Sequence, residues 1–319
     1  EIIVIDDRSK DRTYEIAESY ARSYTQIKLL QIKDSSAYIA PKKRAIDFGI
    51  QQASGEIILT TDADCQPKSN WVAGMVKYFE ADVGLVAGFN PYQANDDRVF
   101  NKILALDYFA MASVAAASIG LNFPISCSGG NLAYRKEVYH ELGGFKDFSA
   151  WISGDDDFFL EQVREKSTWR IRYAIDPETH VPTLPPKNLR EFVQQRIRYA
   201  SKGRSYTAKV TAVLVGVYLM NTALVATGVF AFFNSTLFPA WALSVVLKSL
   251  AEFAFLRAAG KRLAVSFENP TFILTAFLHP IYILVIGLLG QTITFEWKGD
   301  RYGAKMPGAK TQRFGYTRI

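Results

Sequence analysis

Residues 56–64, Glu-Ile-Ile-Leu-Thr-Thr-Asp-Ala-Asp, combine a short apolar run with two carboxylates at its end. The run has the length and the β-branched content of a buried strand. Asp62 and Asp64 then leave the strand together, at its carboxyl end. Carboxylate oxygens suit Mg²⁺ or Mn²⁺, and an ion of this kind commonly also binds phosphate oxygens. Asp62 and Asp64 are therefore candidate metal ligands, although a solvated turn is an equally good explanation of the motif taken alone.

The sequence around this stretch alternates between strand and helix patterns. Short β-rich runs occupy residues 2–5, 27–32, 57–61 and 83–88, and helical patterns separate them at residues 13–24, 42–53 and 69–80. This alternation predicts an α/β fold with mostly parallel strands. Ligands of such sheets bind beyond the carboxyl ends of the strands. Asp6 and Asp7 lie at one such end and Asp62 and Asp64 at another, so we expect both pairs on the same rim.

Two later segments also carry groups that point to chemistry. Residues 98–119 form an unusually apolar helical pattern, for which we favour a position at a membrane interface, and Gly129-Gly130-Asn131 then leads into a short strand at residues 132–134. Gly154-Asp155-Asp156-Asp157 opens a predicted helix at residues 158–166. One carboxylate at a helix N-terminus is explained as a cap. Capping does not explain three consecutive carboxylates.

The second part of the chain is both basic and apolar. The net charge of +6 divides into −5 for residues 1–191 and +11 for residues 192–319. Apolar stretches at residues 210–233, 237–256 and 271–295 are candidate membrane spans, the third interrupted by His279-Pro280. Because Lys and Arg flank these stretches and do not interleave with aromatic residues, membrane lipids are the expected partners and nucleic acid is not. Two cysteines are too few for a disulfide framework.

Five motifs, taken in order, resemble those of family 2 glycosyltransferases. They are residues 1–13, similar to the nucleotide-binding segment; residues 43–59, similar to the approach to the Asp-x-Asp motif; residues 129–135, similar to the acceptor-side loop; residues 154–157, similar to the acidic pair; and residues 195–199, similar to the Gln-x-x-Arg-Trp segment. The chain departs from the family at three positions. Asp47 replaces the common Asn, Asp155 replaces the more frequent Glu, and Tyr199 replaces Trp, which weakens any inference to a processive synthase.

The resemblance implies a GT-A nucleotide-sugar-binding (Rossmann-like) sheet followed by C-terminal transmembrane helices. It implies an inverting transfer of sugar from a nucleotide-diphosphate donor, most readily a UDP-sugar, to a lipid or polysaccharide acceptor, with Mg²⁺ or Mn²⁺ as cofactor. The donor-binding residues would be Asp7, Lys43, Asp62 and Asp64, the last two also holding the metal. Asp156 would be the general base, with Asp155 as the alternative, and Gly130, Asn131, Gln195 and Arg198 would face the acceptor or the diphosphate.

The resemblance also implies an integral protein of the plasma or inner membrane with three parts. Residues 1–207 would be a cytosolic catalytic domain, residues 208–295 a transmembrane region and residues 296–319 a basic tail. The positive-inside rule predicts a cytosolic tail, and therefore an even number of crossings after residue 208. One of the three stretches would then be re-entrant or interfacial, or the stretch interrupted by Pro280 would form two short segments. A first strand and helix are expected upstream, with that strand between the ones ending at Ile5 and Thr61.

Three alternatives stay open at the level of sequence. A nucleotidyltransferase shares the sheet and the acidic metal site. A non-catalytic membrane scaffold derived from a transferase is also possible. The basic residues after residue 195 fit contact with anionic lipid as well as they fit a role in the site, namely Arg196, Arg198, Lys202, Arg204 and Lys209.

Overall fold

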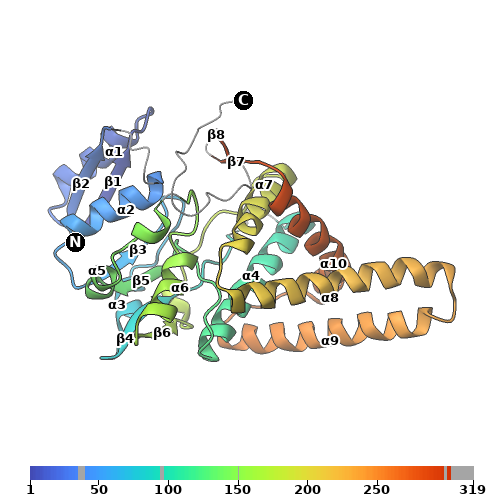
Figure 1. The fold of residues 1–319 in the computed structure, drawn as a ribbon. Coiled ribbons are helices and arrows are strands. Elements are labelled where there is room, and N and C mark those ends of the chain that lie inside the picture. The colour runs from blue at the N-terminus through green and yellow to red at the C-terminus, as the bar shows by residue number, and fades with distance from the viewer. Residues whose placement is uncertain (35–39, 94–96, 150, 298–299, 303–319) are drawn as a thin grey trace.

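The computed structural model describes residues 1–34, 40–93, 97–149, 151–297 and 300–302 (Figure 1). Its strands form two separate sheets at the N-terminal end. β1 (Ile2–Asp7) pairs in parallel with β2 (Ile27–Ile32). The larger sheet has the order β3 (Ile57–Thr60), β5 (Leu132–Arg135), β4 (Val83–Ala87) and β6 (Arg170–Tyr173). The predicted α/β fold is therefore confirmed.

Strand direction follows the prediction except at β5. β4 and β6 are parallel, whereas β5 is antiparallel to both β3 and β4. The sequence pattern marks residues 132–134 as a strand but carries no signal of direction, because that depends on where the preceding segment returns to the sheet. β1 and β3 share no ladder among the described strands, and the strand expected upstream stays a prediction.

α2 (Pro41–Gln52) joins the two sheets through side chains. Ile50 is fully enclosed in the core of the larger sheet. The neighbouring Gly49 lies so close to Ile5 of β1 that an added Cβ would approach its Cδ1 atom to 2.6 Å. Pro41 starts the helix, where its missing N–H costs nothing and its fixed φ suits the first turn. The remaining short helices of this part are α1 (Thr13–Ser23), α3 (Trp71–Val76), α5 (Lys136–Glu141), α6 (Asp157–Lys166) and the 3₁₀ turns η1 (Lys146–Phe148), η2 (Pro177–Thr179) and η3 (Ser201–Arg204).

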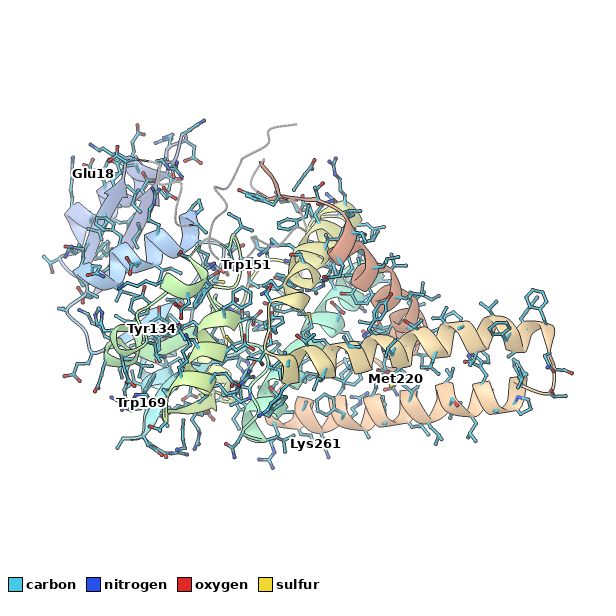
Figure 2. All side chains as sticks on the ribbon, in the orientation of Figure 1. Glu18, Tyr134, Trp151, Trp169, Met220 and Lys261 are labelled. Carbon is cyan, nitrogen blue, oxygen red and sulfur yellow. The ribbon has the colours of Figure 1, made fainter. Side chains whose placement is uncertain are left out.

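One hydrophobic core extends from the larger sheet into the C-terminal helices. It includes Leu85 of β4 and Phe109 of α4 (Val99–Gly120), together with Leu256 of α9 (Phe238–Arg262) and Phe272 of α10 (Asn269–Thr292). Residues from both sides of the predicted domain boundary at residue 207 therefore share one core. The division of the chain into a catalytic domain and a transmembrane region stays a prediction. Tyr134, labelled in Figure 2, lies within the sheet-bearing part of this core at 1 % exposure.

Within the described residues, four helices are long and apolar enough to cross a membrane, namely α4, α8 (Ala208–Phe233), α9 and α10. α8 and α9 form a hairpin that projects away from both sheets, with Met220 along its length (Figures 1 and 2). Phe232 and Phe233 at its far end are 84 % and 81 % exposed. A large exposed apolar surface of this kind is unfavourable in water, so the hairpin is suited to a lipid environment.

The chain returns to the larger sheet after α4. This helix links β4 to β5, and these two strands are hydrogen-bonded neighbours. Its apolar stretch is 39 % buried, more than that of α8, α9 or α10. Both observations favour an interfacial or buried position for α4 over a crossing.

Both ends of α10 also return to the part of the chain that carries the sheets. Glu268, directly before α10, pairs with Lys102 of α4 at 2.7 Å. After α10, β7 (Phe295–Trp297) packs on α7 (Leu189–Ala200), and the Glu296 N–H donates to Gln194 Oε1 at 2.8 Å. Pro280 lies inside one continuous helix, so the structure does not contain the predicted alternative of two short segments. β7 forms a short antiparallel ladder with β8 (Asp300–Tyr302), and most of the predicted basic tail lies outside the described residues.

This arrangement predicts two crossings, both by the α8–α9 hairpin. Single cysteines introduced at Ser235 in the hairpin turn and at Thr317 in the tail, in a variant lacking Cys65 and Cys127, should be labelled from opposite sides of sealed vesicles. The turn lies at the far end of the hairpin, whereas the chain reaches the tail beside α7. Labelling of both cysteines from the same side would contradict the even count of crossings.

Candidate active site

Acidic residues from two distant segments meet at the rim of the larger sheet. Asp62 and Asp64 follow β3, and their carboxylates lie with the Cys65 thiol so that one ligand atom from each is within 4.8 Å of the others. Asp155 lies before α6 and is 9 % exposed. The Lys42 amine connects the two segments, 2.8 Å from Asp62 Oδ1 and 3.0 Å from Asp155 Oδ2.

Lys42 is held as a cation by the carboxylates around it. Burial alone would lower its pKa, but Asp155 and Asp62 outweigh that effect and raise the pKa far above the usual value of a lysine. A single positive charge thus keeps the strand-end carboxylate and the acidic loop close together.

Gly129 and Gly130 form the wall between these groups. A Cβ at Gly129 would lie 3.0 Å from Asp155 Oδ2 and 3.3 Å from Lys42 Nζ. A Cβ at Gly130 would lie 3.3 Å from Asp62 Oδ2 and 3.1 Å from Cys65 Sγ. Both glycines therefore let the loop approach the carboxylates closely, which is consistent with the predicted position of Gly130 in the site.

The residues after β3 fit a divalent cation. Asp62 and Asp64 supply the hard oxygen ligands that Mg²⁺ and Mn²⁺ prefer. Burial, together with the two carboxylates, raises the pKa of the Cys65 thiol, so at neutral pH it is protonated and a poor ligand. The two carboxylates are thus the residues that would hold the ion.

The three basic residues at the start of α2 have three different partners. Lys42 contacts the carboxylates, whereas Lys43 is 1 % exposed and donates to the carbonyl oxygens of Trp151 and Ser153. Burial lowers the pKa of Lys43 to about 8. Arg44 pairs with Asp7 at 2.7 Å. Contact of Lys43 with the donor stays a prediction, and its position against the loop at residues 151–153 lends that prediction no support.

Asp156 is fixed by backbone donors. Its Oδ1 accepts from the Asp157 N–H at 2.7 Å, and its Oδ2 accepts from the Gly129 N–H at 3.0 Å. Burial alone would raise the pKa of Asp156, but Lys202, Lys42 and these two N–H groups lower it, so the carboxylate is ionised at neutral pH. Asp155 lies against Lys42 instead. Both carboxylates border the Gly129 loop, and the choice of base between them stays open.

α7 brings Gln195 and Arg198 to the neighbourhood of the acidic loop. Gln195 Oε1 accepts from the Tyr92 hydroxyl at 3.2 Å, and Arg198 Nη1 donates to Ser153 Oγ at 3.4 Å. Arg196 points elsewhere, because it is 2 % exposed and pairs with Asp107 of α4. Arg196 therefore holds α7 against α4 and does not face lipid.

Asn131 lies in the interior of the protein. It is fully buried, its side-chain amide donates to the carbonyls of Phe89 at 3.0 Å and Thr179 at 2.8 Å, and its Oδ1 accepts from Trp71 Nε1 at 2.9 Å. All of these partners are internal, so the predicted acceptor contact of Asn131 is not supported by its position.

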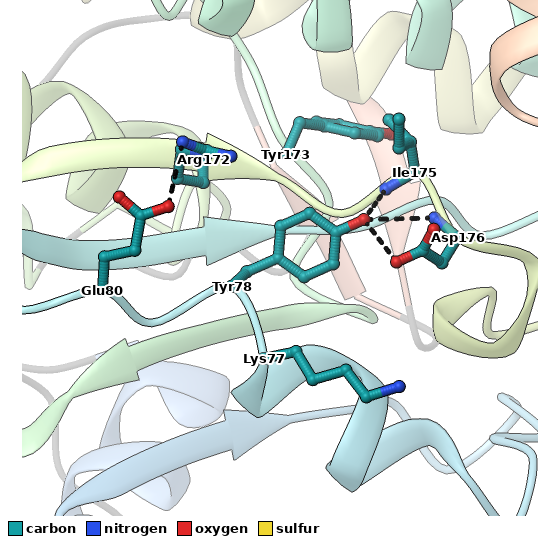
Figure 3. A pocket seen from close by; sticks show the side chains of 7 residues that line it. All are labelled: Lys77, Tyr78, Glu80, Arg172, Tyr173, Ile175 and Asp176. Carbon is teal, nitrogen blue, oxygen red and sulfur yellow. Dashed lines mark hydrogen bonds and ion pairs between the residues drawn. The ribbon is translucent and has the colours of Figure 1, made fainter.

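A separate hollow of about 390 Å³ lies beside β6, away from these carboxylates (Figure 3). Its polar side chains have partners, since the Tyr78 hydroxyl donates to Asp176 at 2.8 Å and Arg172 pairs with Glu80 at 3.5 Å. Lys77 pairs at 3.1 Å with Glu178, which does not line the hollow. No residue predicted from the sequence to bind donor, metal or acceptor lines it. Its full lining is Lys77, Tyr78, Glu80, Arg172, Tyr173, Ile175 and Asp176.

Comparison with a solved structure agrees with this architecture. The mannosyltransferase PcManGT from Pyrobaculum calidifontis, solved in complex with GDP-Man and Mn²⁺, matches 90 % of this chain and 77 % of its own with a TM-score of 0.50 and 19 % identity. At this identity the match shows the fold alone, which is of the GT-A type.

Sequence comparison also finds similarity to glycosyltransferases. Residues 1–143 match the model of glycosyl transferase family 2. A poly-beta-1,6-N-acetyl-D-glucosamine synthase of Staphylococcus epidermidis is 26 % identical over 210 residues, which are 64 % of this chain and 47 % of that protein. The probable glycosyltransferase YdaM of Bacillus subtilis is 27 % identical over 209 residues, 65 % of this chain and 48 % of its own. The chain is thus similar to glycosyltransferases of family 2 over its first 143 residues, and it spans about half the length of these curated relatives.

Two residues at the centre of the geometry were not predicted from the sequence. Lys42 adjoins the predicted Lys43 on the same helix, and only the phase of α2 decides which amine faces Asp62. Lys202 contacts Asp157, 45 residues earlier. The run of three carboxylates is the one signal of a buried cation nearby, and it does not identify which cation.

Replacing Asn131 by leucine should destabilise the fold. Trp71 Nε1 and the carbonyls of Phe89 and Thr179 would lose their buried partners, each at a cost of about 1–3 kcal/mol. Thermal unfolding of the purified protein measures the effect. Asn70→Ala is the matched control, because Asn70 is exposed and its side chain caps no helix N–H. Unchanged thermal stability of Asn131→Leu with lost acceptor binding would instead restore Asn131 to the acceptor site.

Proposed function

We propose that this protein is an inverting, metal-dependent glycosyltransferase that moves a sugar from a nucleotide-diphosphate donor to a lipid or glycan acceptor at a membrane. The observation that carries the proposal is the Lys42 bridge between Asp62 and Asp155. Through it, the candidate metal ligand Asp62 and the alternative base Asp155 both contact one amine, beside the Gly129–Gly130 wall. The family 2 match of residues 1–143 supports the same reaction class.

Donor binding is assigned to the Asp62 side of the site. A divalent ion held by Asp62 and Asp64 would neutralise the diphosphate that becomes the leaving group. Lys42 is close enough to Asp62 to add a second positive charge there. Asp7, at the end of β1, is the proposed partner of the nucleotide base, and its present partner Arg44 would reorient on binding. A UDP-sugar is the first donor to test, with UDP-N-acetylglucosamine favoured by the name of the staphylococcal relative.

Sugar transfer is assigned to the Asp155–Asp156 side. The acceptor hydroxyl oxygen attacks the anomeric carbon as the bond from that carbon to the diphosphate oxygen breaks. The hydroxyl proton passes to the base carboxylate, and the nucleoside diphosphate leaves with the bonding electrons. One in-line displacement with a single positioned base inverts the configuration at the anomeric carbon. We retain Asp156 as the base and Asp155 as the alternative.

The acceptor is assigned to the side of α7 and the hairpin. Gln195 and Arg198 lie next to the acidic loop, and the chain continues from them into α8. An acceptor that enters along α7 would therefore be close to the membrane surface. The names of the staphylococcal relatives favour a growing polysaccharide, and the apolar hairpin is equally suited to a lipid-linked acceptor. We propose that the site faces the cytosol, where nucleotide sugars are available.

Removing Asp64 should abolish metal-dependent binding of the nucleotide. Calorimetry of the Asp64→Ala variant with UDP and Mn²⁺ measures this, because the ion would lose one of its two carboxylate ligands. Glu178→Ala is a suitable control, since it removes a carboxylate that pairs with Lys77 far from the site. Equal UDP affinity with and without Mn²⁺ in the wild-type protein would refute the metal assignment.

Asp156→Asn should stop transfer while nearly preserving donor affinity. A general base acts in the transition state, so its loss lowers kcat by about 10²–10⁴-fold. Release of nucleoside diphosphate in a screen of nucleotide sugars, combined with mass analysis of extracted lipids and glycans, measures transfer and tests the proposed function as a whole. The same release separates it from a nucleotidyltransferase, which would form a nucleotide–sugar bond. If Asp155→Asn is instead the variant that binds donor but does not transfer, Asp155 is the base.

A further inference from the structure

We propose that Asp157 and Lys202 form a buried ion pair that positions the base loop and ties it to the chain segment entering the membrane hairpin. This inference rests on the proposed function, and it assigns a role to two residues that the reaction itself does not use. Asp157 is 6 % exposed and Lys202 is 5 % exposed. They come from the start of α6 and from η3, the turn directly before α8.

Asp157 is less suited than Asp156 to be the base, because each of its oxygens accepts two hydrogen bonds, whereas each oxygen of Asp156 accepts one. Oδ1 accepts from Ser126 Oγ at 3.0 Å and from the Cys127 N–H at 3.1 Å. Oδ2 accepts from Tyr206 Oη at 2.9 Å and from Lys202 Nζ. One carboxylate therefore joins the segment leading to Gly129 and Gly130, the first turn of α6, and the segment leading into α8.

Lys202 is shared between this anchor and the candidate base. Its Nζ contacts Asp157 and lies 3.9 Å from Asp156 Oδ1. Burial alone would lower the pKa of Lys202, but the carboxylate of Asp157 raises it well above its usual value, so Lys202 is a permanent cation here. The buried carboxylate of Asp157 and the half-buried carboxylate of Asp156 are adjacent, and they would repel each other without such a charge.

The position of Lys202 couples the site to the hairpin. Only a few residues separate it from Ala208, where α8 begins, and α6 makes further bonds to this connection. Glu161, one turn along α6, accepts from the Thr207 N–H at 2.7 Å, and Arg164 donates to Thr207 Oγ1 at 3.0 Å. A shift of α8 would thus move Lys202 relative to Asp156 and change both the placement and the charge balance of the base.

The pKa of Asp156 distinguishes this proposal from a purely structural tether, because only the charge of Lys202 would change that pKa. Removing this cation should raise the pKa of Asp156, so that a higher pH is needed to deprotonate the base. Removing the negative charge of Asp157 should do the opposite. The groups that face Asp156 and contribute to this balance are Lys42, Lys43, Cys127, Asp155, Asp157 and Lys202.

The experiment measures kcat, donor KM and the pH profile of kcat/KM for the full-length protein in lipid nanodiscs, by release of nucleoside diphosphate. Lys202→Met should lower kcat by about 10²-fold with donor KM nearly unchanged, since small misplacements of a base have effects of that size. The acid limb of the kcat/KM profile should move to higher pH in Lys202→Met and to lower pH in Asp157→Asn. Lys202→Arg keeps the positive charge, so its acid limb should coincide with that of the wild-type protein.

Two further variants complete the experiment, one for the event that a single variant does not fold and one as a control. Asp157→Asn/Lys202→Met removes both charges together and leaves no unpaired buried ion, so it provides the profile if a single variant does not fold. Its acid limb should lie between those of the single variants. Glu161→Gln is the control, because it weakens the link to Thr207 without changing the charge next to Asp156.

Failure of this inference and failure of the proposed function give different results. An active wild-type protein whose acid limb is the same in Lys202→Met, in the double variant and in Glu161→Gln would overturn the positioning pair alone. Absence of nucleoside diphosphate release by the wild-type protein with any nucleotide sugar would overturn the proposed function, and the pair's role with it.

Discussion

The structure depends on balancing the negative charge of the carboxylates gathered at one end of the larger sheet. Asp155 and Asp157 are almost fully buried, and Asp156 lies between them. Carboxylates so close together in a poorly hydrated site are stable only when cations and N–H donors surround them. Lys42 supplies positive charge on the side of Asp62, and Lys202 supplies it on the side of α8. The positions of both lysines are therefore dictated by the acidic loop, and they determine how α2 and η3 lie against it.

The same charge balance explains why distant parts of the chain converge. Lys42 comes from a helix that joins the two sheets, and Lys202 comes from the connection to the membrane hairpin. The proposed donor side and the proposed base side are thus linked by one cation, while the base side and the hairpin are linked by another. Arg196 and Asp107 repeat this arrangement between α7 and α4, where a buried pair fixes the helix that carries Gln195 and Arg198.

Much of the fold and part of the site could be predicted from the sequence. Short apolar, β-rich runs located β1, β2, β3 and β4, and the helical pattern located α6, each to within about two residues. The resemblance to family 2 glycosyltransferases implied one site for Asp62 and Asp155, which are 93 positions apart, and in the structure the Lys42 amine contacts both. The direction of β5, the choice between Lys42 and Lys43, and the inward position of Asn131 were beyond the sequence, because each depends on tertiary packing. Arg196 illustrates the same limit. A basic residue before an apolar helix suggests contact with lipid, but Arg196 is buried in the structure.

The continuous core across residue 207 has a consequence for how the protein can be handled and how it matures. Leu256 of α9 and Phe272 of α10 cover apolar side chains of α4 and the larger sheet. Translation delivers residues 1–207 before either of these helices exists, so the nascent domain has an uncovered apolar face until the hairpin has inserted and α10 has docked. The domain can therefore complete its hydrophobic core only once the chain has reached the membrane. A truncated chain without α9 and α10 would expose this apolar face, so a water-soluble version would need the face redesigned.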